Sequence, residues 1–268
     1  MNPKDLLASG QLNEAIDTAL SEVKKNPNDK SLRFFLAELL CFRGEWERAD
    51  RQLDSVVQQA VDASLLALLF RQLIRAEIIR EQVFADGRAP ELVVPLSRDA
   101  EIQLELNAAL RADHESELPA LVTAADQHRV EVSGECNEQA FAGIRDLDDR
   151  IAGVLEVLTA TGKYFWVPWH TVKTLEFSRP ERPMDLIWRK ASIDVEGGPE
   201  GEVYIPTRYP LPHAKDWDDA MRLGRATDWQ GQEPSAVRGK GLRMLLIGDE
   251  AKSIMDLVDV STAQDSLL

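Results

Sequence analysis

The feature that most constrains the fold is a repeat of residue types at a spacing of 34 positions near the N-terminus. Three small or apolar positions of the first copy recur in the second. The matched positions are Gly10 with Gly44, Leu12 with Trp46, and Ala15 with Ala49. This spacing is the period of tetratricopeptide repeats, which are stacked helical hairpins. The pattern therefore predicts two hairpins of this type, although an ordinary pair of helical hairpins would give a similar spacing.

Each matched position has a structural role in such a hairpin. The glycine lets the paired helices approach, the bulky residue two positions later fills the space beside it, and the alanine permits a close helix crossing. We therefore expect Trp46 to be a buried anchor. Two repeats cannot bury their faces alone, so they need a further supporting element. The apolar stretch over residues 62–84 predicts that element, a long helix that begins almost entirely apolar and then becomes amphipathic.

The character of the chain changes near residue 131. Two more helical patterns, over residues 97–112 and 116–128, precede this point. Beyond it, short runs rich in Val, Ile, Thr and aromatic residues predict strands. The expected elements are a hairpin within 154–177, strands within 185–196, 201–209 and 241–250, and a helix over 216–224.

These patterns together predict an α+β chain with two parts. Residues 1–130 are expected to form a helical domain with two degenerate tetratricopeptide-like repeats and the helices that follow. Residues 131–268 are expected to form a β-rich module with one short helix, built as a barrel-like or curled sheet.

Charge and composition exclude two kinds of partner. Lys and Arg total 31 and Asp and Glu total 46, which gives a net charge of −15. Nucleic-acid binding needs a concentrated positive surface, so neither nucleic acid nor an anionic membrane is an expected partner. The opening residues lack the apolar core of a secretory signal, and no run approaches the roughly 20 apolar residues of a membrane span. With only two cysteines, we expect a soluble protein of the cytoplasm.

No catalytic signature is present in the sequence. The nucleophile elbow, the phosphate-binding P-loop, the zinc-protease helix motif and the dinucleotide glycine motif are all absent. The four histidines have no ligand spacing, and Cys136 lies in a polar loop without a partner signature. We therefore predict that the protein is not an enzyme and has neither a cofactor nor a metal site.

An acidic cluster leaves a second function open. Asp146, Asp148 and Asp149 could offer oxygen ligands to a hard cation. The calcium-loop pattern fails, however, because Arg150 stands at its fifth position and Ile151 at the position that requires glycine. A charged turn is the favoured interpretation. The alternative is a small-molecule or divalent-cation module, possibly enzymatic, that uses this cluster or an aromatic cleft.

An aromatic cluster is the first candidate for partner binding. Phe165, Trp166 and Trp169 belong to one strand-like stretch. Because side chains alternate along a strand, this stretch presents large rings to both faces of a sheet. One face must pack in the core, while the other is either core as well or an exposed patch that docks a partner.

Two arginines are the second candidate. Arg71 and Arg75 lie four positions apart, hence on one helix face. In an acidic chain they are suited to bind a partner's carboxylates through the guanidinium fork. The alternative is that both pair internally, with Glu77, Glu81 or acids of the β-rich module, and so clamp the two halves together.

Several sequence blocks, taken in order, resemble a known family. The most distinctive are RQLIRAE at 71–77, YFWVPW at 164–169 and LGRATDW at 223–229. In this combination the chain is similar to the ImpE/TagJ family of type VI secretion accessory proteins, over about residues 3–260. The resemblance implies a non-enzymatic cytoplasmic adaptor. It also implies binding to the N-terminal helix of the small sheath subunit and a link to sheath recycling by a ClpV-type unfoldase.

Overall fold

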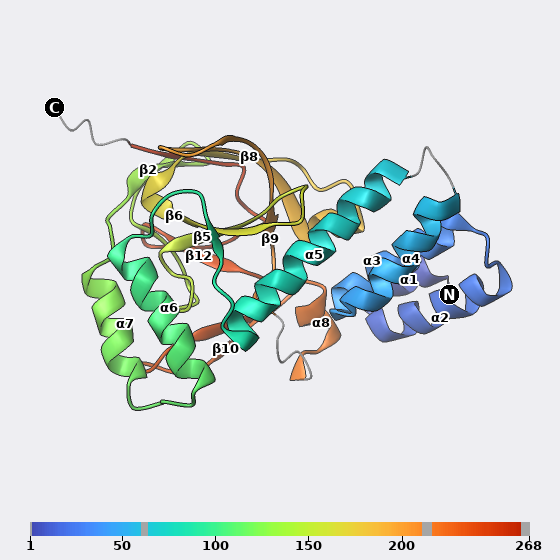
Figure 1. Ribbon diagram of the computed structural model, residues 1–268, viewed down its shortest axis with the longest axis horizontal. Coiled ribbons are helices and arrows are strands. Elements are labelled where there is room, and N and C mark those ends of the chain that lie inside the picture. Colours follow the sequence, from blue (N-terminus) through green and yellow to red (C-terminus); the bar gives the residue numbers. More distant parts are fainter. Residues whose placement is uncertain (1, 60–63, 211–215, 264–268) are drawn as a thin grey trace.

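Helices fill the first half of the chain in the computed structural model, which describes residues 2–59, 64–210 and 216–263 (Figure 1). The first four helices form two consecutive hairpins, namely α1 (Pro3–Ala8), α2 (Leu12–Lys25), α3 (Lys30–Arg43) and α4 (Trp46–Gln59). Gly10 and Gly44 lie at the equivalent turns between paired helices. Their φ angles are +82° and +77°, which glycine adopts without steric cost.

The matched positions of the repeat lie at equivalent places in the two hairpins. Leu12 and Trp46 begin the second helix of each pair, and Ala15 and Ala49 follow one turn later. All four side chains are buried. The two hairpins thus have the register that the spacing predicts, while their assignment as tetratricopeptide repeats stays a prediction.

One long helix, α5 (Ser64–Asp86), joins the hairpins to the β-rich half (Figure 1). The predicted start of this helix, at residue 62, lies outside the described residues. α5 packs on α4 and also on strands β5 (Val154–Leu158) and β6 (Tyr164–Pro168). Leu73, Ile74 and Ala76 are fully buried along it. The helix therefore covers the face of α4 that two hairpins alone would leave exposed.

Two further helices, α6 (Arg98–Arg111) and α7 (Leu118–Gln127), form a third hairpin close to its predicted bounds. They pack on each other, and α6 also contacts α5. In the part of the chain that is described, no helix combines the length and apolarity that crossing a bilayer requires.

The β-rich half is built on a curled sheet whose described strands run in the order β1-β6-β5-β9-β8-β7-β14-β2-β3. The bounds of those not yet given are β1 (Glu91–Leu92), β9 (Glu200–Pro206), β8 (Trp188–Val195), β7 (Val172–Phe177), β14 (Asp259–Thr262), β2 (Ser133–Cys136) and β3 (Gln139–Ala142). β1 pairs in parallel with β6, whereas the other neighbours are antiparallel. Because the end strands β1 and β3 do not pair with each other, the sheet stays open. The barrel-like form considered above is therefore wrong, and the curled form is observed.

Shorter elements complete this half of the molecule. They are β4 (Ile144–Asp146), β12 (Met244–Ile247) and β13 (Glu250–Ser253) in one small sheet, β10 (Thr227–Gln230) and β11 (Arg238–Gly241) in another, the 3-10 turns η1 (Trp169–Thr171) and η2 (Pro183–Leu186), and α8 (Asp219–Arg222). The helix predicted over 216–224 is reduced to the single turn of α8. Its first turn is capped by Asp218, whose carboxylate accepts the Met221 N–H at 2.8 Å.

Arg208, Asp219 and Arg225 bind the ends of the N-terminal helices. Arg225 donates to the carbonyls of Leu7 and Ala8 at the end of α1, at 2.9 and 3.2 Å. Arg208 donates to the Phe42 carbonyl near the end of α3 at 2.8 Å. The Asp219 carboxylate accepts the first N–H of α2, from Leu12, at 2.8 Å. Helix ends carry unpaired backbone groups, so the β-rich half supplies partners that the hairpins lack.

Two cores lie on opposite sides of the main sheet. The larger is shared by the hairpins, α5 and the helix-facing side of the sheet, where Tyr164, Trp166 and Trp188 are buried. The smaller fills the other side and includes Val167 and Trp169. The larger core thus extends without a break from the helices to one face of the sheet.

Candidate functional site

A groove of about 960 Å³ lies on the helical half of the molecule. Side chains of α1, α2, α3, α4 and α5 line it, together with residues at the start of η2. Its apolar lining consists of Leu7, Leu32, Phe34, Phe35, Val56 and Leu66. The volume falls within the range of about 300–1,000 Å³ that is usual for ligand pockets. A second hollow of about 330 Å³ shares Lys4, Leu7, Arg182 and Pro183 with it and extends toward Phe42 and Leu223.

The charges of the groove differ from those of the chain. Lys4, Lys30 and Arg182 line it, against the two acids Glu22 and Glu38, although the whole chain carries −15. The Lys4 ammonium lies 5.9 Å from the centre of the Phe35 ring, within the range of a cation–π contact. The groove is therefore locally basic at its rim.

Glu38 is the unusual residue of this groove. It lies in the middle of α3 and is only 5% exposed, because large apolar residues surround it on the helix. Among the described residues it has no hydrogen-bond or ion-pair partner. Burial raises the pKa of the Glu38 carboxyl to about 8, with Arg182 and Lys4 opposing this effect and Asp185 adding to it. At neutral pH the carboxyl is therefore mostly protonated.

Replacing Glu38 by glutamine should stabilise the protein at alkaline pH. The carboxyl has a pKa of about 8 in the folded chain and about 4.5 when unfolded. Between these values the unfolded carboxyl loses its proton while the folded one keeps it, so stability falls as the pH rises through this window. Glutamine removes that loss, which should amount to about 2–4 kcal/mol near pH 8. Urea unfolding of both proteins measures the difference, which should vanish below about pH 4.5; a constant difference would contradict the raised pKa.

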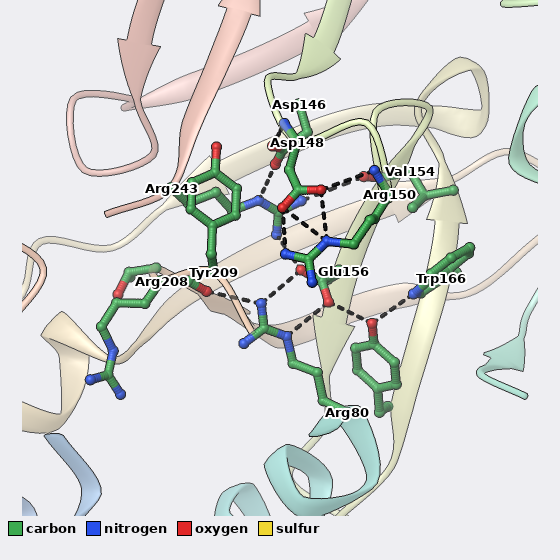
Figure 2. A network of polar contacts seen from close by, with 12 residues as sticks. Arg80, Asp146, Asp148, Arg150, Val154, Glu156, Trp166, Arg208, Tyr209 and Arg243 are labelled. Atoms are coloured by element: carbon green, nitrogen blue, oxygen red, sulfur yellow. Dashed lines mark hydrogen bonds and ion pairs between the residues drawn. The ribbon is translucent and has the colours of Figure 1, made fainter. Parts of the chain in front are cut away.

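A buried network of charged groups joins α5 to the sheet (Figure 2). Arg80 donates to both oxygens of Glu156 at 2.8 and 2.9 Å, to Glu77 at 2.7 Å and to the Arg208 carbonyl at 2.9 Å. Arg243 forms a second ion pair with Glu156, with 3.2 Å between Nη1 and Oε2. Burial alone would raise the pKa of Glu156, but the two guanidiniums and the Tyr164 hydroxyl lower it to about 2. This carboxylate is therefore ionised and held by charge on two sides.

The acidic cluster belongs to the same network. Asp146 and Asp148 are fully buried. The Asp146 carboxylate contacts Arg243, and the Asp148 carboxylate contacts Arg150 (Figure 2). Guanidinium groups thus occupy the positions where a cation would have to bind. In the described ranges, no group of three or more His, Cys, Asp or Glu residues is placed to hold a metal ion.

The aromatic candidates lie mostly inside the protein. Trp166 and Trp169 are buried, one in each core, so the idea of an exposed patch is wrong for these two side chains. β6 is covered on one side by α5, and on its other side Val167 is buried in the smaller core. Phe165 is partly exposed, and the Lys163 ammonium lies 5.8 Å from its ring centre.

The two arginine candidates do not clamp the halves together. Arg71 binds Asp50 and Asp54 of α4, at 2.7 and 2.5 Å, so its partners lie within the helical half. Arg75 is exposed and donates to Gln72 at 3.3 Å. The residue that joins α5 to the β-rich half is Arg80, which lies after Arg75 on the same helix. A role of Arg71 or Arg75 in docking stays a prediction.

Comparisons with known proteins agree with this architecture. A family model described as ImpE protein matches residues 138–261, which is most of the β-rich half. A curated relative from Pseudomonas aeruginosa, the type VI secretion system accessory component TagJ, is 34% identical over 242 residues. The match covers 85% of this chain and 81% of that relative. The chain belongs to the ImpE/TagJ family.

The same fold is found in a solved structure from another organism. An X-ray crystal structure of a Vibrio parahaemolyticus protein superposes with a TM-score of 0.91 at 29% identity, covering 98% of both chains. The ImpE/TagJ chain therefore shares its whole architecture, hairpins and curled sheet together, with a protein of known structure. The groove and the buried network lie within the region compared.

Proposed function

We propose that this protein is a non-enzymatic, cytoplasmic accessory protein of a bacterial type VI secretion system. In this proposal its groove binds the N-terminal helix of the small sheath subunit, and it acts in sheath assembly or in recycling by a ClpV-type unfoldase. The accessory role is supported by the 34% identical relative, which is named as such a component. The observation that carries the binding role is the apolar groove between the hairpins and η2.

The groove is suited to an amphipathic helix. Such helices bind by placing an apolar face in a hydrophobic groove, and helical-repeat folds offer concave surfaces for this purpose. Phe34, Phe35 and Leu32 provide apolar side chains in the groove. The basic groups at the rim would attract acids beside the apolar stripe of the partner and raise the rate of encounter.

A pull-down tests the proposal directly. The full-length small sheath subunit should be recovered by the protein, whereas a version without its first helix should not. Replacing Phe35 in the groove by serine should reduce the recovery of the full-length subunit at least tenfold, about 1.4 kcal/mol. Equal recovery of the two subunit versions would contradict the binding of a helix.

Phe165→Ser is the matched control for the groove variant. It also removes a partly exposed phenylalanine, but from the sheet rather than the groove. Recovery should stay unchanged with this control. A loss with Phe165→Ser and none with Phe35→Ser would move the docking surface to the β-rich half.

A further inference from the structure

Glu38 differs from four of the other buried acids among the described residues in lacking a positive partner, and it differs from Asp99, which also has no ion pair, in lining the groove. Glu77, Asp146, Asp148 and Glu156 each contact an arginine. Glu38 is buried to a similar degree, yet within the described part of the chain no donor reaches it. The Glu38 side chain is one of the residues that line the groove.

A buried carboxyl without a partner is energetically unfavourable in either protonation state. As an anion it has no ion-pair partner, and as a neutral acid it has no hydrogen bond to a described residue of the protein. Lys4 and Arg182 act on it electrostatically, but neither forms an ion pair with it. A molecule bound in the groove could bring a positively charged group next to the Glu38 carboxyl, which has no such partner within the described residues.

We infer that the helix bound in this groove carries one lysine or arginine within its apolar face, and that this cation pairs with Glu38. The inference rests on the proposed function, because it describes the helix that the groove binds. The apolar stem of such a side chain would pack against the groove lining while its charged end reaches the carboxylate. Acids on the flanks of the helix would face Lys4, Lys30 and Arg182.

This arrangement gives the groove specificity for one pattern of charge. A helix with an uninterrupted apolar face would leave Glu38 buried and unpaired, and one with basic flanks would be repelled by the rim. Specificity of this kind depends on what the wrong partner leaves unsatisfied. The favoured ligand is a helix whose apolar face contains a single lysine or arginine and is bordered by acidic residues.

Binding should also release a proton. The carboxyl is mostly protonated in the empty groove, with its pKa raised to about 8 by burial, and a cation beside it favours the ionised form. The charged groups that face Glu38 are Lys4 of α1, and Arg182 and Asp185 at η2; Glu22 and Lys30 also line the groove. Affinity should therefore rise with pH up to about 8, by nearly tenfold between about pH 6 and pH 7.

Titration calorimetry with a synthetic peptide of the sheath subunit's N-terminal helix tests the inference. Measured in two buffers of different ionisation enthalpy, the wild-type protein should release about nine-tenths of a proton per peptide near pH 7. Glu38→Gln should abolish this release and weaken binding at least tenfold near pH 8. Glu22→Gln, which neutralises the other acid of the groove, should leave the proton release unchanged.

Peptides in which each basic residue is replaced by alanine identify the cation. One of these replacements should weaken binding to the wild type as much as Glu38→Gln does, and should add nothing in the Glu38→Gln variant. Binding without proton release, equal in wild type and Glu38→Gln, would overturn the inference and leave the proposed function standing. No binding of the peptide to the wild type would overturn both. Thermal unfolding of each variant confirms that it is folded.

Discussion

Replacing Arg80 by methionine should lower the free energy of unfolding by about 3–5 kcal/mol, the cost of removing one partner from a buried ion pair. The reason is that Glu156 and Glu77 would stay buried without their principal counter-charge. Arg80 makes four hydrogen bonds at 2.7–2.9 Å and is 1% exposed. Urea unfolding near neutral pH measures the loss.

Arg71→Met is the matched control for this prediction. Arg71 lies on the same helix and also binds two carboxylates, but its pairs are partly exposed to solvent. Its replacement should cost less than about 1 kcal/mol. Adding Glu156→Gln to Arg80→Met should recover part of the loss, because a neutral amide is cheaper to bury than an unpaired charge. Equal losses for Arg71→Met and Arg80→Met would contradict the role given to the buried network.

Replacing Trp46 by alanine should cost about 3–5 kcal/mol, since it empties a site shaped for a large ring. Trp46 is 2% exposed, and its ring centre lies 5.8 Å from that of Trp188 on the sheet. Its indole N–H donates to Glu81 at 2.8 Å. The residue therefore packs inside the second hairpin and against the sheet at the same time.

Trp46→Phe separates the ring from the hydrogen bond. It should cost less than the alanine variant, because most of the packing remains. Burial raises the pKa of Glu81 to about 7, and the Trp46 hydrogen bond opposes this shift. The phenylalanine variant should therefore raise the pKa of Glu81 further. A loss below about 1 kcal/mol for Trp46→Ala, far under the usual cost, would show that the anchor role is wrong.

The helical half was predictable because its information is local. The spacing of 34 placed Gly10 and Gly44 at their turns and Trp46 at a buried position. The alternation along β6 likewise placed Tyr164 and Trp166 on one face and Phe165 on the other. The spacing of apolar residues indicates which face of a helix or strand is buried. The positions in the hairpins and the two faces of β6 both follow from this spacing.

The parts that were missed depend on contacts between distant positions. Arg80 and Glu156 lie 76 positions apart, and no spacing in the sequence connects them. Whether the sheet closes is decided by pairing between its end strands, which strand patterns do not specify. Trp166 could not be assigned to the interior because its burial depends on α5, and Trp169 could not because its burial depends on the smaller core on the other side of the sheet.

Glu38 was overlooked although a signal for it was present. It stands within the stretch LRFFLAELLCF, where apolar residues flank it on every side of the helix. An acid in such a setting has to be either neutral or partnered. The sequence contains that signal, but only the three-dimensional structure shows that the residue faces a groove rather than another element.

The hydrogen bonds that Arg208, Asp219 and Arg225 form with the N-terminal helices limit how segments of this fold can be exchanged between relatives. Most of the groove wall is encoded in the first third of the gene, with Arg182 and Pro183 added from η2. The partners of its helix ends are encoded more than 160 positions after the helices. A hybrid that exchanges only the hairpins between relatives would bring in helices whose terminal carbonyls meet foreign side chains. Arg208, Asp219 and Arg225 have to be transferred with the hairpins they hold. New binding specificities are more accessible through single side chains lining the groove, such as Phe35 and Glu38, than through the exchange of whole segments.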